Sequence, residues 1–252
     1  MKPTTPKVYI LAYTALADNR SGNPLPREYE ASIGISKPWE TDGETQGEVL
    51  TEMAGRLCYR SWEAGLNPNV TKIREGNGKY LGNVLEQRHG SVLEHTNVTF
   101  LFHGVSRVFT HELVRHRVGT AISQESLRYV RLDENSPMVL PPDIVQAIME
   151  DLSGETVNDY VSGLGQILQH ITDRFGINEP GVKFSVKKAV TSAMRRFIGM
   201  GVATDIVWTA NIRTLRHVLE MRSDAPNVEW EMMEVFGRQV GPLMIQMYPA
   251  LF

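Results

Sequence analysis

The fold is decided by the stretch VLEHTNVTFLFHGV at residues 92–105. Its β-branched and aromatic side chains alternate along the chain, which is the pattern of a β-strand. Ser106 follows with a side chain suited to cap a helix, so residues 107–117, RVFTHELVRHR, are expected to form a helix that ends near Gly119. A strand joined directly to a capped helix is therefore the centre of the predicted structure.

The segments on either side of this centre are predominantly helical. Apolar residues at helical spacing predict helices at residues 46–60, 80–88, 144–175, 182–198, 211–222 and 227–247. A first strand is expected at residues 8–17 and another at residues 127–131, LRYVR, and a short apolar stretch at 205–210 leads into the helix at 211–222. Several long helices around a modest, mostly antiparallel sheet place the chain in the α+β class.

The size and composition of the chain favour a single domain. The 252 residues, of which 42% are hydrophobic, are enough for one large core. Residues 18–45 are rich in Gly, Pro, Asn, Ser and charge, which is typical of a long surface loop. We find no internal repeat, so residues 1–252 are expected to form one domain with a loop excursion near 18–45.

Charge and cysteine content narrow the range of partners and locations. A formal net charge of -3 argues against a general nucleic-acid binder, which needs a broad positive field. The apolar run at residues 8–17 is short for a membrane span, so no membrane partner is expected. A lone cysteine, Cys58, cannot form an internal disulfide, and a cytoplasmic, reducing location is therefore the expectation.

A basic cluster follows a run rich in histidine. Five of the seven histidines lie within residues 89–116, and residues 107–131 then carry five arginines (Arg107, Arg115, Arg117, Arg128 and Arg131) against two glutamates. The planar guanidinium suits phosphate, and the small residues of VGTAISQES at 118–126 let backbone N–H groups approach an anion. The pattern favours an anion site, and a solvated charged face is the alternative.

The sequence gives weaker support for a zinc site, a cysteine nucleophile or a dinucleotide-binding motif. His111-Glu112 resembles the start of a zinc-hydrolase motif, but the next histidine is His116, about 140° away around a helix, so no metal site is predicted. Cys58 lies in an apolar helical run and is expected to be a small core residue rather than a nucleophile. The run Gly199–Thr204 follows a basic helix rather than a strand, so it indicates a helix-ending turn.

One constellation resembles a known family. Arg115-His116-Arg117, followed by VGTAISQE and then Ser126-Leu127-Arg128, is similar to the signature of the flavin-dependent thymidylate synthases (ThyX). The stretches HGSVLEH at 89–95, RLCY at 56–59, WTANIRTL at 208–215 and MRSD at 221–224 also resemble that family. The resemblance spans about residues 50–235.

The resemblance implies an activity and its cofactors. It implies reductive methylation of C5 of a uridine monophosphate, with FAD, methylenetetrahydrofolate as carbon donor and NADPH as electron donor. It also implies a homotetramer whose active sites lie at subunit interfaces. No enzyme nucleophile is needed, which agrees with the weak case for Cys58.

The family's functional positions can be carried over residue by residue. The flavin is expected to meet Ser91, Arg115, His116, Arg117, Gln124, Asn211, Arg213 and His217. The nucleotide is expected to meet Glu112, Arg115, Glu125, Ser126, Arg128, Arg195 and Arg222. Arg222 would polarise the uracil ring, Arg115 would assist at the reacting centre, and His89 would lie near flavin and folate.

Some of these positions have alternatives. Arg213 and Arg195 could be surface charges, Arg196 could take the register of Arg195, and His217 could cap or pack. A non-catalytic homologue that still binds flavin or nucleotide is the second functional reading, and a metal-dependent hydrolase is the third.

The chain departs from the family pattern near the nucleotide. Eight residues rather than seven separate the triplet from Ser126, and the usual Gln before the triplet is Glu112. The stretch Asp224–Trp230 lacks the family's His and Gln. We expect the extra residue to bulge within residues 118–121, where glycine makes a bulge cheap. These changes suggest that UMP is accepted beside dUMP, as in relatives from nucleoside-antibiotic pathways.

Overall fold

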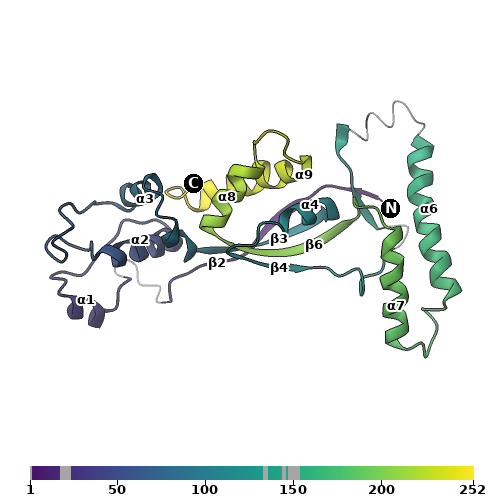
Figure 1. The fold of residues 1–252 in the computed structure, drawn as a ribbon, viewed down its shortest axis with the longest axis horizontal. Coiled ribbons are helices and arrows are strands. Elements are labelled where there is room, and N and C mark those ends of the chain that lie inside the picture. Colours follow the sequence, from purple (N-terminus) through teal and green to yellow (C-terminus); the bar gives the residue numbers. More distant parts are fainter. Residues whose placement is uncertain (1, 18–23, 133–135, 144–145, 147–153) are drawn as a thin grey trace.

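A four-stranded antiparallel sheet forms the centre of the molecule (Figure 1). The computed structural model describes residues 2–17, 24–132, 136–143, 146 and 154–252. The sheet order is β2 (Lys7–Tyr13), β3 (Asn97–Ser106), β6 (Ala203–Asn211) and β4 (Thr120–Gln124). A separate parallel pair joins β1 (Lys2–Thr4) to β5 (Pro137–Val139). The predicted α+β class with a mostly antiparallel sheet is confirmed.

One face of the sheet carries the main core. Phe100 on β3 pairs with Trp208 on β6, and Phe102 pairs with Ile206, and all four side chains are buried. The helices that cover this face are α4 (Arg107–Leu113), α8 (Ile212–Arg222), α9 (Trp230–Met232), η3 (Met233–Val240, π-helical) and α10 (Gly241–Met247) (Figure 1). Their aromatic residues pack against the strands, as Phe236 does edge-to-face against Trp208 with ring centroids 5.7 Å apart. Burial of these large aromatic surfaces holds sheet and helices together.

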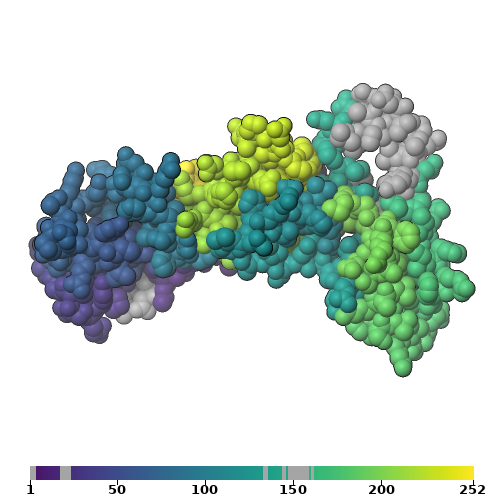
Figure 2. All heavy atoms as spheres, viewed as in Figure 1, coloured from purple at the N-terminus to yellow at the C-terminus, as the bar shows by residue number. Residues whose placement is uncertain are grey.

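Helical lobes extend from both ends of the sheet, so the molecule is elongated (Figures 1 and 2). One lobe holds α1 (Arg27–Ile33), α2 (Gln46–Tyr59), α3 (Asn77–Glu86) and the 3-10 helix η1 (Gly90–Glu94). The other holds α6 (Gly154–Arg174), α7 (Phe184–Met194) and the 3-10 helix η2 (Arg195–Phe197). Each lobe has its own small apolar cluster, around Trp39 and Trp62 in the first and around Leu168 and Met194 in the second.

Several predicted elements differ from the structure. The helix after Ser106 ends at Leu113 rather than near Arg117, because the N–H groups of Arg115 and His116 turn back onto the carbonyls of Glu112 and Leu113. These tighter bonds close the last turn early. His116 therefore lies outside α4, and the 140° angle expected for a continuous helix does not apply.

The predicted strand at residues 127–131 is wrong. The N–H groups of Tyr129 and Val130 both bond the carbonyl of Ser126, and the Ser126 hydroxyl accepts from the N–H of Arg128, which makes a turn. A serine that bonds its own downstream backbone competes with strand pairing. The strand of this region is β4, which lies earlier in the chain.

Smaller differences concern boundaries and one cysteine. The excursion predicted at 18–45 contains α1, and its residues 18–23 lie outside the described residues, as do most of residues 144–153 of the predicted helix at 144–175. Cys58 is exposed, not a core residue, because it lies on the outer side of α2. No helix among the described residues is long and apolar enough to cross a membrane.

Candidate functional site

A charged cluster lies where α4 ends and α8 passes beside it. Arg222, in the last turn of α8, places its Nη2 atom 2.9 Å from Oε2 of Glu112 on α4. Its Nε–H also donates to Nε2 of His116 at 3.2 Å. Arg115 reaches the same carboxylate more loosely, at 3.8 Å, and the ring of His217 lies 6.0 Å from that of His116. Five of the predicted site residues therefore come together here.

The protonation state of His116 follows from this environment. Burial lowers the pKa of His116, and the neighbouring Arg222 and His217 lower it further. A neutral imidazole can accept a hydrogen bond at Nε2, whereas an imidazolium cannot. The bond from Arg222 therefore requires neutral His116 and fixes the direction of the Arg222 guanidinium.

A tight turn connects the triplet to β4. Gly119 has φ +69°, and a Cβ built on it would lie 2.2 Å from Nδ2 of Asn211 and 2.7 Å from Oγ1 of Thr214. The carbonyl of Gly119 accepts from the N–H of Asn211 at 3.1 Å, and the hydroxyl of Thr214 donates to the carbonyl of Val118 at 2.6 Å. Only glycine combines this backbone conformation with this approach. The turn is thus fastened to the first turn of α8.

The extra residue of the loop does not form a bulge in β4. The strand pairs with β6 without a register shift, from Thr120 opposite Ala210 to Gln124 opposite Ile206. The predicted bulge at 118–121 is therefore wrong for its strand half, residues 120–121. Residues 118–119 form the turn before the strand, in which Val118 is exposed and Gly119 has φ +69°.

A second set of predicted residues lies at the other end of α8. Arg213 forms an ion pair with Glu94 at 2.5 Å, and a Cβ on Gly90 would lie 2.9 Å from Nε of Arg213. Ser91 is exposed on the same short helix, η1. Between Arg213 and Arg222, nine residues of α8 span roughly 14 Å, so a ligand that contacts both ends must be extended.

His89 is held just before η1. Its ring stacks on that of Tyr59, with centroids 5.8 Å apart and planes at 26°. Its N–H bonds the carbonyl of Val84 at 3.0 Å, and the preceding residue, Arg88, has φ +56°. A left-handed non-glycine residue persists only where its surroundings hold it. The direction of His89 is therefore fixed by backbone and ring contacts together.

The third set lies at the far end of β4. Gln124 donates to Oγ1 of Thr110 at 3.1 Å, which ties β4 to α4. Arg195 donates to the carbonyl and the hydroxyl of Ser192, both at 3.1 Å. Arg128 is exposed, and its N–H bonds the Ser126 hydroxyl at 3.3 Å. Arg128 and Arg195 are exposed, whereas Gln124 is half-buried against α4.

Arg107 is a residue to which the sequence assigns no role. Its Nη2 donates to the carbonyl of Glu125 at 3.0 Å, whereas its Nε is buried without a partner among the described residues. Burial lowers the pKa of Arg107, and nearby Arg195 lowers it further. The sequence marks Arg107 only as a member of the basic cluster, and its side chain is half-buried because β4 folds back beside α4.

No metal centre is evident in the described part of the chain. Residues 2–17, 24–132, 136–143, 146 and 154–252 contain no group of three or more His, Cys, Asp or Glu side chains placed to hold a metal ion. His111 is exposed in the last turn of α4, and His116 lies beyond the end of that helix.

The fold and the site together define an α+β protein with an arginine-rich site suited to phosphate groups. The family model described as "Thymidylate synthase complementing protein" matches residues 42–249. A flavin-dependent thymidylate synthase of Mycobacterium sp. (strain JLS) is 38% identical over 197 residues, which cover 77% of this chain and 74% of that protein. The corresponding enzyme of Mycobacterium tuberculosis (strain ATCC 25177 / H37Ra) is 35% identical over 187 residues, covering 74% and 71%. The chain belongs to the flavin-dependent thymidylate synthase family and is an enzyme of that type.

Solved structures share the fold at low identity. The UMP/dUMP methylase PolB from Streptomyces cacaoi, bound with 5-Br dUMP, superposes with a TM-score of 0.65 at 15% identity, covering 100% of this chain and 95% of that one. ThyX from Helicobacter pylori with FAD and dUMP gives a TM-score of 0.58 at 18% identity, with coverage of 98% and 99%. The ThyX-like fold predicted from the sequence is confirmed.

Proposed function

We propose that this enzyme transfers one carbon to C5 of dUMP and of UMP and reduces it to a methyl group. The carbon donor is methylenetetrahydrofolate, the cofactor is FAD, and NADPH supplies electrons in a cytoplasmic setting. The observation that carries the proposal is the cluster in which Glu112 and neutral His116 orient Arg222. Two solved relatives, a UMP/dUMP methylase bound with 5-Br dUMP and a ThyX with FAD and dUMP, support it.

Arg222 has the burial and the partners of a polarising group. Its side chain is 22% exposed, so its charge is partly shielded from water yet still reachable. A fixed cation of this kind stabilises negative charge that develops on a uracil ring during attack at C5. Glu112 would hold the cation in place. Its carboxylate has lone pairs beyond those used by Arg222, and these could accept a hydrogen bond from a ribose hydroxyl.

The residues present fit a flavin cofactor. Arg115 and Arg117 are exposed on the turn, and the approach of Gly119 to Asn211 leaves backbone groups close to the start of α8. Arg213, Ser91, Gln124 and His217 complete the donor set proposed to hold the cofactor. Bound FAD, once reduced, supplies the electrons that convert the transferred carbon into a methyl group. The protein's own part is to bind and orient the reactants.

A homotetramer completes the proposal. The face of the sheet opposite the helices carries no covering element in Figure 1. On that face Tyr9 pairs with Leu101, which pairs with Val207, and Tyr9 is 47% exposed. The proposed site residues are spread along the chain, and several of them, such as Arg115 and Arg213, are exposed, so a second copy of the chain would close them in. We propose that this open face binds that copy.

The test is methylation of dUMP and UMP measured side by side. We expect purified protein to be yellow, to bind FAD on titration and to methylate both nucleotides. Flavin binding without turnover would instead support a non-catalytic homologue. Protein that takes up no FAD would contradict the proposal, and turnover of dUMP alone would remove its UMP half.

A further inference from the structure

A cavity of about 400 Å³ lies between the end of α2 and the end of α3. Tyr59 and His89 form one wall, and Lys72 and Arg74 contribute positive charge from the loop that joins the two helices. Ser61 and Asn83 add polar groups. The cavity is separate from the cluster around Arg222, and the functional roles proposed above leave it unused apart from His89.

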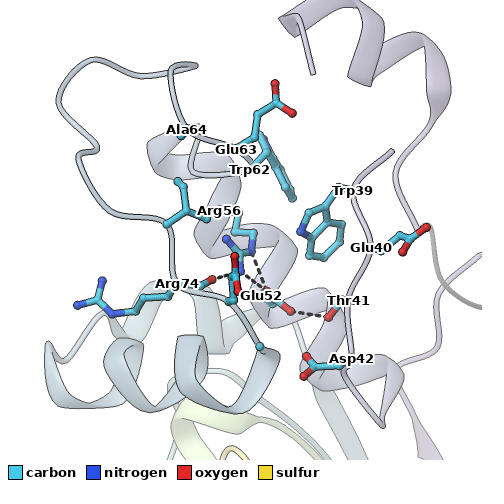
Figure 3. Close-up of a pocket in the computed structure, with 13 residues that line it drawn as sticks. Trp39, Glu40, Thr41, Asp42, Glu52, Arg56, Trp62, Glu63, Ala64 and Arg74 are labelled. Carbon is cyan, nitrogen blue, oxygen red and sulfur yellow. Dashed lines mark hydrogen bonds and ion pairs between the residues drawn. The ribbon is translucent and has the colours of Figure 1, made fainter. Parts of the chain in front are cut away.

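The charge of this cavity is opposite to that of its neighbour. No aspartate or glutamate lines it, although acidic residues outnumber basic ones in the chain, 29 to 26. The adjoining cavity, of about 610 Å³, is lined by Glu40, Asp42, Glu52, Glu63 and Glu75 (Figure 3). Arg74 borders both cavities, and Figure 3 shows its guanidinium pointing away from the one between Trp39 and Trp62. The positive charge thus remains available to the smaller cavity.

The loop that carries Lys72 and Arg74 is held in place by hydrogen bonds from Arg56. Arg56 is buried and donates to the carbonyl of Ser61 at 2.7 Å. It also donates to the carbonyl of Arg74 at 2.8 Å (Figure 3). Its Nε–H donates to Glu52, also at 2.7 Å. Two ends of the loop are therefore fixed to one buried guanidinium, which orders the backbone at Arg74. The side chains of Lys72 and Arg74 are exposed and make no ion pair with a described residue.

Backbone strain is concentrated beside the aromatic wall. Among the described residues, three that are not glycine have positive φ, and two of them, Arg60 (φ +49°) and Arg88 (φ +56°), directly adjoin Tyr59 and His89. Such conformations cluster at ligand-binding sites, where the surrounding structure maintains them. Here they orient the stacked pair, whose rings can face a flat ligand at one end of the cavity.

The cavity also adjoins the proposed flavin residues. His89 is followed by Gly90, which packs against Arg213, and by Ser91 on η1. A molecule whose ring reacts near the flavin would pass His89 and Tyr59. Its remaining part would then meet Lys72 and Arg74.

We propose that this cavity binds the negatively charged tail of a ring-bearing co-substrate. The inference rests on the proposed function, because it assigns a subsite to one of that reaction's co-substrates. The folate donor carries carboxylates on its tail and the nicotinamide donor carries phosphates, so both share the required chemistry. Lysine and arginine are the side chains that recognise either group.

The test is a charge-removing double variant, Lys72→Gln with Arg74→Gln, in the full-length FAD-loaded enzyme. We expect KM for one co-substrate to rise at least about tenfold, with kcat and the KM for dUMP unchanged. A rise for methylenetetrahydrofolate, larger with several glutamates than with one, identifies the carboxylate tail. A rise for NADPH identifies the phosphates. Lys79→Gln, an exposed lysine of α3 outside the cavity, is the matched control and should change nothing.

The inference is overturned if KM for both co-substrates stays within about twofold of the wild-type value. The charge-keeping variant Lys72→Arg should retain wild-type KM. This result would show that a rise in KM comes from loss of charge and not from disruption of the loop. If the wild-type enzyme shows no turnover, the proposed function fails on its own. Direct titration with tetrahydrofolate triglutamate and with NADPH then decides the subsite, and equal binding by wild type and double variant refutes it.

Discussion

At the scale of single residues, the contacts of Arg222 hold its charge in one orientation. Its guanidinium is fixed by Glu112 on one side and by neutral His116 on the other. A charge that is oriented before the substrate arrives costs little reorganisation during the reaction. The role assigned to Arg222 is therefore testable separately from flavin binding.

We expect Arg222→Ala to lower kcat by about 10²–10³ while FAD remains bound, because one donor to the developing charge is lost. Turnover and the flavin absorbance spectrum measure the two effects. Arg222→Lys keeps the positive charge but loses the planar guanidinium, so its kcat should lie between those of wild type and Arg222→Ala. Near wild-type turnover in Arg222→Ala would show that another residue polarises the ring.

Gly119 provides a second prediction at this scale. Gly119→Ala should destabilise the fold by about 1–3 kcal/mol, because alanine disfavours positive φ and its Cβ would overlap Nδ2 of Asn211. The free energy of unfolding in urea measures the effect. Gly163→Ala on α6, where a Cβ meets nothing within 4 Å, is the control and should not destabilise. Equal stability of the two variants would contradict the tight approach.

At the scale of elements, the turn between the triplet and β4 is expected to border the space beside the nucleotide. Deleting Val118, whose side chain is 83% exposed, restores seven-residue spacing and keeps Gly119. We expect the ratio of UMP to dUMP turnover to fall, because the shorter turn removes room near the ribose. Substitution of Val118 by Ala is the control and should leave the ratio unchanged. An unaltered ratio after deletion would mean that loop length does not select the sugar.

A buried carboxyl joins three elements at the start of α4. Glu231 on α9 accepts hydrogen bonds from the N–H of Ser106, at 2.7 Å, and from its hydroxyl. Burial raises the pKa of Glu231 to about 7. Between pH 4.5 and about 7, the folded protein therefore keeps a proton on Glu231 that the unfolded chain has lost. Stability is fully retained below the unfolded pKa and decreases as pH rises towards about 7.

Glu231→Gln should remove this pH dependence. Wild type is expected to lose up to about 3 kcal/mol of folding free energy between pH 4.5 and pH 8 relative to the variant. Urea unfolding of both proteins across that range measures the difference. If the difference in unfolding free energy between the two proteins is the same at every pH in this range, the pKa of Glu231 does not lie within it.

At the scale of the whole molecule, the proposed assembly through the open face of the sheet can be tested at Tyr9. We expect Tyr9→Lys to shift the sedimentation coefficient towards the monomer and to weaken FAD binding, because a buried lysine would oppose contact between two copies. Phe175→Lys, at an apolar position on the far lobe that is exposed to a greater extent than Tyr9, is the control and should remain assembled. A stable, active monomer of the wild-type protein would exclude shared active sites.

A feature of this protein could be predicted from the sequence when the residues that form it lie close together in the chain. The strand at β3, the cap at Ser106 and the helix α8 follow from residues close together in sequence, and the structure confirms them. The turn at 127–131 is also local, because Ser126 bonds the backbone that directly follows it. The half-burial of Arg107 does not follow from nearby residues, because its partner Glu125 is placed by the pairing of β4 with β6, which lies far along the chain. A local pattern cannot report on a partner that distant.

The sequence by itself determined the α+β class, the family and the residues of the basic cluster, because these depend on periodicity and on motifs that are contiguous in the chain. Only the tertiary structure decided which of those residues meet. It joined Arg222 to Glu112 and His116, fastened the turn at Gly119 to Asn211, and placed Lys72 and Arg74 beside His89. Each of these contacts joins separate elements, so its geometry is determined by how the helices pack on the sheet.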